Sequence, residues 1–131
     1  KIRSRKQKIT NETSIYLADT LGDLGLWYNL SNIVFLGGSL VKIGGHNPYE
    51  PCRFGNAIIT GPYVFNFQEV FDQLNCRGAS ITVRNVKELV ENIIHLSNKN
   101  KAYFIGQKGL KYVNSLKDRS YTIINTINSF M

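Results

Sequence analysis

Three short stretches pair a helix-capping residue with a carboxylate at a fixed spacing. They are Thr20–Asp23, Asn47–Glu50 and Asn66–Glu69. This is the spacing of a capping box, in which the first side chain accepts from a backbone N–H and the acidic one reaches back. In the second stretch Pro48 takes the first helical position, where proline is favoured. Each stretch predicts a helix N-terminus, and the free N–H groups there favour phosphate or carboxylate.

Four glycines precede the second of these stretches. They are Gly37, Gly38, Gly44 and Gly45. Glycine allows a left-handed backbone and a close approach to a ligand, so this loop is a candidate phosphate cradle. The spacing matches neither the dinucleotide-binding fingerprint nor the P-loop, so the pattern indicates an anionic ligand without naming one.

Each of these residues also has an ordinary structural interpretation. Asp23 and Glu50 can serve as capping carboxylates alone. His46 can donate to an anion or bond to the backbone, and Arg53 can meet a ligand anion or remain solvated. The aromatic pair Trp27–Tyr28 is interpreted as packing residues rather than a base-stacking platform.

The elements that must position these residues alternate along the chain. Runs of β-branched and aromatic residues predict strands at Ile15–Ala18, Ile33–Leu36, Ala57–Thr60 and Ser80–Val83. Helical spacing predicts helices at Leu21–Leu30, Pro48–Phe54, Phe67–Leu74 and Val86–Leu96. Alternation of this kind predicts an α/β fold with a mainly parallel sheet. Its carboxyl edge, where open α/β sheets bind ligands, would receive all three junctions.

The remainder of the chain is helical in pattern. Apolar residues three and four apart predict a C-terminal helical extension over 102–131, and the polar stretch Asn98–Lys101 is the expected loop before it. No linker or repeat divides the sequence, which predicts a single domain over 1–131.

Composition narrows the class of protein. The 131 residues are 43% hydrophobic and 19% charged, which excludes a disordered tail, a collagen-like chain and a coiled coil. The net charge of +7 favours an anionic partner: nucleic acid, a membrane surface or a phosphorylated ligand. Five of the 16 positive charges lie in the first eight residues, which form either a solvated end or an anion-contacting surface.

Cysteine usage and hydropathy bear on the compartment. Cys52 and Cys76 lack metal-ligand spacing, which predicts reduced thiols and no metal site. No apolar stretch approaches the roughly 20 residues of a membrane-spanning helix, and no apolar segment follows the basic N-terminus. We therefore expect a soluble segment that does not span a membrane.

Four blocks in order along the chain resemble a known family. Tyr16–Tyr28 contains D-T-L-G-D-L, and Phe35–Val41 reads F-L-G-G-S-L-V. Gly44–Pro51 reads G-G-H-N-P-Y-E-P, and Gly61–Phe67 contains G-P followed by N-F. These blocks are similar to D-T-x-G-E-L, F-V-G-G-S-L, G-G-H-N-P-L-E-P and G-P-x-x-x-N-F of bacterial 3-deoxy-D-manno-octulosonic acid (Kdo) transferases. Two positions differ from the usual family residues: Asp23 replaces glutamate and Tyr49 replaces leucine.

The resemblance implies a fold and an activity. The family consists of two-domain GT-B glycosyltransferases, and this chain resembles the latter part of the C-terminal, Rossmann-like, donor-binding domain. The implied activity is inverting transfer of Kdo from CMP-Kdo to the lipid A precursor at the cytoplasmic face of the inner membrane, in lipopolysaccharide biosynthesis. CMP-Kdo is a donor substrate, and no metal or cofactor is expected. An anionic membrane surface is a further candidate partner, and nucleic acid is not expected.

The resemblance also assigns residues. The implied donor-nucleotide contacts are Leu21, Gly22, Asp23, Asn47, Pro48, Tyr49 and Glu50, with Gly44, Gly45, His46 and Asn66 as further candidates. Glu50 is the expected partner of the ribose hydroxyls, because a carboxylate accepts two such bonds. The family's catalytic base belongs to the N-terminal domain. We therefore expect no catalytic residue in this chain, and we do not expect it to complete the transfer alone.

A partial donor domain has expected consequences for stability. A strand at Ile15–Ala18 would present an unpaired edge, which predicts weak stability or self-association. Since the last helix of GT-B enzymes commonly returns to the other domain, Ile123, Ile124, Ile127 and Phe130 are expected interdomain contacts.

Two other functions fit part of this pattern. One is the donor domain of another GT-B nucleotide-sugar transferase, which differs in its preferred nucleotide. The other is a non-catalytic module for nucleic acid or membrane surfaces, which needs cations and exposed aromatic residues on one face. The interior cations are dispersed in sequence, which argues against the second.

Overall fold

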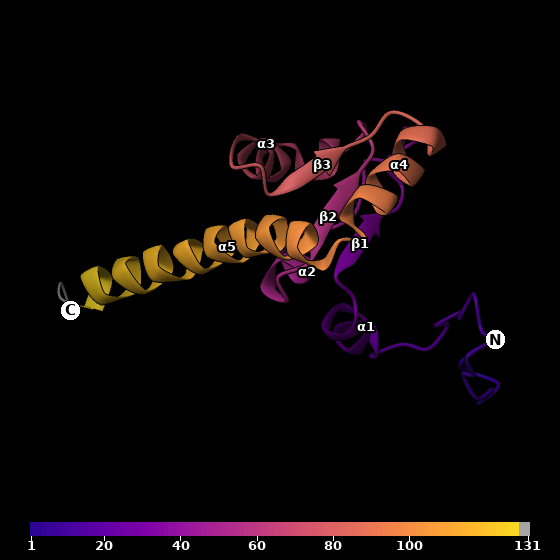
Figure 1. Ribbon diagram of the computed structural model, residues 1–131. Helices are drawn as coiled ribbons and strands as arrows, with labels where there is room; N and C mark the ends of the chain where they lie inside the picture. The colour runs from indigo at the N-terminus through magenta and orange to yellow at the C-terminus, as the bar shows by residue number, and fades with distance from the viewer. Residues whose placement is uncertain (129–131) are drawn as a thin grey trace.

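The computed structural model describes residues 1–128, with side chains described at all of these positions except 99 and 118–128. Figure 1 shows the arrangement of the elements. In chain order they are α1 (Leu24–Leu30), β1 (Ile33–Leu36), α2 (Tyr49–Arg53), β2 (Ala57–Thr60), the 3₁₀ turn η1 (Phe65–Phe67), α3 (Gln68–Cys76), β3 (Ser80–Thr82), α4 (Val86–Leu96) and α5 (Lys99–Asn128).

The three strands form one parallel sheet in the order β1-β2-β3. Phe35 of β1 lies opposite Ile59 of β2, which in turn lies opposite Ile81 of β3. Every residue of the central strand is buried, as expected for a parallel strand covered on both faces. The predicted α/β class is therefore confirmed.

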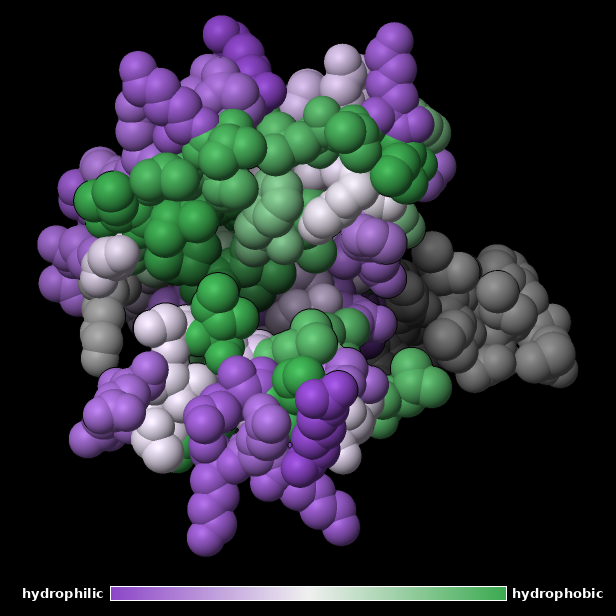
Figure 2. All heavy atoms as spheres, turned by 90° about the vertical axis from the view of Figure 1, so that its right-hand side faces the viewer, coloured by the Kyte–Doolittle hydropathy of each residue, from purple (hydrophilic) through white to green (hydrophobic). Residues whose placement is uncertain are grey.

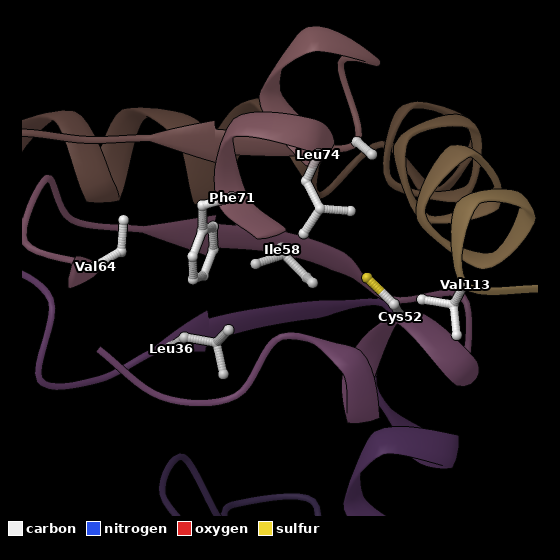
Figure 3. Packing of buried hydrophobic residues seen from close by; sticks show 8 residues of the cluster. Leu36, Cys52, Ile58, Val64, Phe71, Leu74 and Val113 are labelled. Atoms are coloured by element: carbon white, nitrogen blue, oxygen red, sulfur yellow. The ribbon is translucent and has the colours of Figure 1, made fainter. Parts of the chain in front are cut away.

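Successive residues of β2 point to opposite faces of the sheet and separate two apolar clusters. Ile58 packs on the face covered by α3, together with Phe71 and Leu74 (Figure 3). Ile59 packs on the other face, against Leu96 of α4. The helix α5 serves both clusters, because Ala102 belongs to the second cluster and Val113 to the first.

The helix α5 approaches the turn before β2 closely at Gly106. A Cβ atom there would lie 1.8 Å from the carbonyl oxygen of Gly55, so the helix backbone rests on the turn that precedes β2. Only glycine allows this contact. Beyond it the helix projects past the sheet towards the C-terminus (Figure 1).

The predicted loop at Asn98–Lys101 is wrong for most of its length, because α5 begins at Lys99. The Asn98 side chain accepts from the N–H of Asn100 at 3.1 Å, and its carbonyl accepts from Lys101 at 3.0 Å. Asn98 thus lies at the start of the helix, and the polar residues after it belong to α5. Ile123, Ile124 and Ile127 lie where side chains are not described, and Phe130 lies outside the described residues.

The predicted first strand, Ile15–Ala18, is also wrong. This segment makes a single parallel bridge, between Leu17 and Ile2, and does not join the sheet. The N–H of Leu17 donates to Lys1 and its carbonyl accepts from Arg3, so its partner is the chain terminus. Among the described residues the sheet edge on this side is therefore β1, and the edge expected at Ile15–Ala18 is absent.

Candidate ligand-binding edge of the sheet

The loops that follow β1 and β2 are joined by a buried hydroxyl. Ser39 Oγ donates to the carbonyl of Leu36 at 2.6 Å and accepts from the N–H of Gly61 at 2.8 Å. The carbonyl of Ser39 also accepts from the N–H of Tyr63 at 3.0 Å. Sequence reasoning missed this role, although a serine directly after two glycines at a strand end was the available signal.

A second contact between the two loops involves Gly44 and Asn66. The Gly44 carbonyl accepts from the N–H of Asn66 at 3.2 Å, and Asn66 Nδ2 donates to the carbonyl of Ile43 at 3.4 Å. Gly44 has a φ of 108°, and a Cβ atom there would lie 2.4 Å from Asn66 Nδ2. The two loops therefore approach each other where a side chain would not fit.

These contacts correct the prediction that Asn66 caps a helix. The chain makes the turn η1 before α3 begins at Gln68, and no side chain caps α3. Asn66 binds the preceding loop instead. Its contact with Gly44 is a finding of the structure, whereas its contact with a ligand stays a prediction.

The stretch Asn47–Glu50 also departs from a capping box. Asn47 Oδ1 accepts from the N–H of Tyr49 at 2.9 Å, so it forms a turn of its own instead of bonding at Glu50. Pro48 occupies the N-cap position, one residue before the predicted place. Because α2 has only five residues, its dipole supplies little of the anion attraction expected from a helix N-terminus.

Glu50 consequently takes no part in a helix cap. Its side chain is exposed and makes no hydrogen bond or ion pair within the described part of the chain. His46 is also exposed, and its ring lies beside Gly38: a Cβ atom added to Gly38 would lie 3.5 Å from His46 Nε2. Arg53 is exposed in the last turn of α2. The second stretch thus presents uncommitted polar side chains beside the glycine-rich loop.

The first junction, Thr20–Asp23, is built differently. The Asp23 carboxylate forms an ion pair with Arg3, which the sequence did not suggest. Thr20 Oγ1 donates to Asp23 Oδ2 at 2.5 Å, and Arg3 Nε donates to the same oxygen at 2.5 Å. No side chain caps α1, so the predicted capping box is wrong here too. The hydrogen bonds from Arg3 and Thr20, together with the charge of Arg3, hold the pKa of Asp23 below its usual value.

Arg3 belongs to the basic N-terminal cluster, which is not merely a solvated end. Its guanidinium lies 5.3 Å from the ring centroid of Trp27, and Tyr16 packs against the same ring at 5.4 Å. A cavity of about 490 Å³ adjoins the pair. It is lined by Arg3, Ser4, Lys6, Gln7, Lys8, Tyr16, Thr20 and Asp23.

Aromatic packing joins α1, which follows the predicted donor-binding stretch 21–23, to the end of α2, which begins within the stretch 44–50. The rings of Tyr28 on α1 and Phe54 after α2 are 5.8 Å apart, and Tyr28 is buried as predicted. Burial raises the pKa of the Tyr28 hydroxyl, and the nearby charge of Glu50 raises it further. Within the described residues, no hydrogen bond or ion pair joins 21–23 to 44–50, and Leu21 is fully exposed.

The described residues lack a metal-binding cluster and a membrane-spanning helix. No group of three or more His, Cys, Asp or Glu side chains there is arranged to hold a metal ion. No described helix combines the length and the apolar character needed to cross a membrane.

Comparison with known proteins assigns this architecture. No family model matches the chain. It is 39% identical over 111 residues to the 3-deoxy-D-manno-octulosonic acid transferase of Haemophilus influenzae, covering 82% of this chain and 26% of the relative. It is 35% identical over 88 residues to the enzyme of that name from Rickettsia prowazekii, covering 67% of this chain and 19% of the relative.

A solved structure is similar over nearly the same span. The crystal structure of the C-terminal CMP-Kdo binding domain of WaaA from Acinetobacter baumannii matches with a TM-score of 0.78 and 34% identity, covering 85% of this chain and 58% of that chain. The chain belongs to the Kdo transferase family. It spans about a fifth to a quarter of the length of these curated relatives, and the solved match places it in the C-terminal domain of a Kdo transferase.

Proposed function

We propose that this chain is the donor-binding part of a Kdo transferase and holds CMP-Kdo at the carboxyl edge of its sheet. The match to a solved CMP-Kdo binding domain, at 34% identity and a TM-score of 0.78, carries this proposal. The joined loops after β1 and β2 supply a ligand edge of the expected kind.

The parent enzyme, on this proposal, transfers Kdo to the lipid A precursor at the cytoplasmic face of the inner membrane. Inversion at the sugar requires a base that deprotonates the acceptor hydroxyl from the opposite face. We place that base in a part of the enzyme outside these 131 residues, so the chain binds the donor and does not transfer the sugar alone.

Glu50 is the proposed ribose partner. A carboxylate accepts bonds from two neighbouring hydroxyls, and this one is exposed and uncommitted. Asn47, Pro48 and Tyr49 fix the backbone that carries it. The adjoining Gly44, Gly45 and His46 form the proposed wall for the rest of the nucleotide, with Asn66 holding that wall in place.

The phosphate needs stabilisation that increases during the reaction. As the sugar leaves, negative charge accumulates on CMP, and fixed N–H donors stabilise that charge more than the ground state. Arg3 is a candidate donor, because it lines the cavity next to Leu21–Asp23 and Asp23 fixes its orientation. Asp23 then acts by positioning Arg3.

A nucleotide titration tests the proposal. We expect saturable amide NMR shifts at Gly22, Asp23, Gly45, Asn47 and Glu50 with CMP, and weaker binding of UMP and AMP. Glu50→Gln should weaken CMP binding by roughly tenfold, because a neutral amide loses the charge-assisted bonds. Glu91→Gln, which removes an exposed carboxylate from α4, is the matched control and should bind CMP normally.

The result that overturns the proposal is a folded sample whose spectrum does not respond to CMP. A clear preference for UMP or AMP would instead favour the donor domain of a different GT-B transferase. Binding of oligonucleotides of any sequence with equal affinity, weakened strongly by salt, would indicate the non-catalytic nucleic-acid-binding module.

A further inference from the structure

A second charged cavity lies between the end of α3 and the middle of α5. It has a volume of about 360 Å³ and is lined by Arg77, Lys108, Lys111, Tyr112 and Ser115. Three of these five residues are cations and none is an acid. Such a concentration of one sign of charge around a hollow favours an anionic ligand.

The Arg77 side chain is held in a defined orientation. Its guanidinium lies 4.8 Å from the ring centroid of Tyr112. One of its nitrogens, Nη1, donates to the carbonyl of Gln73 at 2.8 Å and to Gln73 Oε1 at 2.7 Å. Both acceptors are neutral, so the positive charge of Arg77 is oriented without being neutralised by a carboxylate.

The two lysines extend this charge along α5. Lys108 and Lys111 are three residues apart on the helix and therefore neighbours on its surface. Lys108 Nζ reaches the end of α3. If Gly78 carried a Cβ atom, that atom would lie 3.2 Å from Lys108 Nζ. Neither ammonium forms an ion pair with a described carboxylate.

Among the side chains that the structure describes, no carboxylate lines this cavity or pairs with one of its three cations. The C-terminus of α3 contributes roughly half an elementary charge. Glu69 and Asp72 line a separate cavity with Gln73, Tyr49 and Tyr112, and Asp72 accepts from Gln68. The acids therefore lie beside the adjoining cavity and do not line this one.

This cavity lies at the opposite ends of the strands from the joined loops, although the predicted donor contact Tyr49 lines the adjoining cavity together with Tyr112. Arg77 follows α3 directly and precedes β3, so the cavity lies near the amino ends of the strands. The joined loops after β1 and β2 lie at the carboxyl ends. Figure 1 shows α3 and α5 bordering this side of the molecule, away from α4.

We propose that the cavity lined by Arg77, Lys108 and Lys111 binds the phosphate group of an organic phosphate ester. The guanidinium of Arg77 supplies hydrogen-bond donors in a fixed plane, and the two lysine ammonium groups supply donors on flexible stems; both kinds bind phosphate oxygens. The ring of Tyr112 and the lysine stems provide apolar walls for the organic part of the ligand. A soluble ester and the headgroup of an anionic phospholipid share this chemistry.

The test uses the 131-residue chain and glycerol 3-phosphate, with glycerol as the uncharged reference, at constant ionic strength. We expect saturable amide shifts at Gly78, Lys108, Lys111 and Ser115 with the phosphate alone. The double variant R77Q/K111Q should bind about tenfold more weakly, because it loses two charge-assisted contacts. The variant R84Q/K87Q removes two exposed cations near and on α4 and should bind normally.

Vesicles distinguish the two sources of phosphate. Co-sedimentation with phosphatidylglycerol but not phosphatidylcholine vesicles, lost in R77Q/K111Q and kept in R84Q/K87Q, identifies the lipid headgroup. Binding of glycerol 3-phosphate without this vesicle binding identifies a soluble ester. Absence of saturable shifts, or equal affinity in R77Q/K111Q and the unaltered chain, overturns the proposal. CMP shifts that persist in R77Q/K111Q show that the two sites are independent.

Discussion

Arg3 Nε donates to Asp23 Oδ2 at 2.5 Å, although 20 residues separate them in the chain. A parallel contact lies nearby, where Ser4 Oγ donates to Asp19 at 2.6 Å. Together with the bridge between Ile2 and Leu17, these bonds tie the basic start of the chain to the segment that enters α1. The charge of Arg3 is thereby given a fixed place beside Asp23.

The tie should weaken in acid. The pKa of Asp23 lies below its usual value of 3.8, chiefly because of the hydrogen bond from Arg3. The stability that this carboxylate contributes is therefore complete above pH 3.8 and is lost as pH falls through the lowered pKa. The fluorescence of Trp27, the sole tryptophan, should report a transition below pH 3.8 that shrinks in Asp23→Asn. Asp72→Asn on α3 should keep the transition, and identical acid curves for Asp23→Asn and the unaltered chain would contradict this assignment.

Ser39→Ala should destabilise the fold by about 1–3 kcal/mol, because it leaves the buried N–H of Gly61 without its acceptor. Urea unfolding followed by circular dichroism measures the change. Ser97→Ala removes an exposed hydroxyl that donates to Ile93 and should cost less than about 0.5 kcal/mol. Equal effects of the two substitutions would show that the bridge adds nothing to stability.

Gly106→Ala should be strongly destabilising, by roughly 3 kcal/mol or more, because its Cβ would overlap the carbonyl of Gly55. Gly25→Ala provides the opposite case. The added Cβ would lie 3.5 Å from Phe54, an ordinary contact, and alanine favours the helix by about 0.5–1 kcal/mol. Thermal unfolding should therefore move in opposite directions, and a stable Gly106→Ala variant would refute the close docking of α5.

The two thiols should differ in reactivity. Cys52 is 1% exposed and burial raises its pKa to about 12, whereas Cys76 is exposed. Since the thiolate is the reactive form, Ellman's reagent should modify Cys76 first. In Cys76→Ser the remaining thiol should react only as the core opens, so its rate should rise with urea. Equal labelling rates of both thiols in native buffer would exclude this packing.

The apolar face of α4 predicts self-association. Val86, Val90 and Ile94 are exposed there, and Figure 2 shows apolar side chains gathered on this side of the molecule. Patches of this kind associate in water. Sedimentation velocity should show a concentration-dependent shift that Val90→Lys with Ile94→Lys removes. Introducing negative charge at the same two positions, with Val90→Glu and Ile94→Glu, should also remove the shift. An unaltered chain that stays monomeric at high concentration would exclude association.

The sequence predicted the elements that are determined by local pattern. Val86–Leu96 was correct at both ends, since its apolar stripe is regular and Asn85 caps it by accepting from Glu88 at 2.9 Å. Ile33–Leu36 and Ala57–Thr60 were also correct, because short apolar runs ending at glycine suit buried parallel strands. The resemblance to Kdo transferases was confirmed by relatives and by a solved structure.

Errors arose where a side chain had a choice of partners. Asn47 and Asn66 have the spacing of caps, yet neither bonds three residues on. Asn47 accepts from Tyr49, the first residue of α2, and Asn66 donates to Ile43 in the preceding loop. Ile15–Ala18 has strand-like residues, but its partner is the chain terminus, which local pattern does not reveal. The ligand contacts assigned to the candidate site stay predictions, because they depend on a bound molecule and not on the fold alone.

The joined loops at the sheet edge are held mainly by main-chain atoms, with Ser39 and Asn66 as the polar side chains that take part. Val41 and Ile43, in the middle of the first loop, are exposed. Their identities can therefore drift over evolutionary time without loosening the scaffold. A change at either position therefore alters the exposed surface of the loop and leaves the backbone frame as it is.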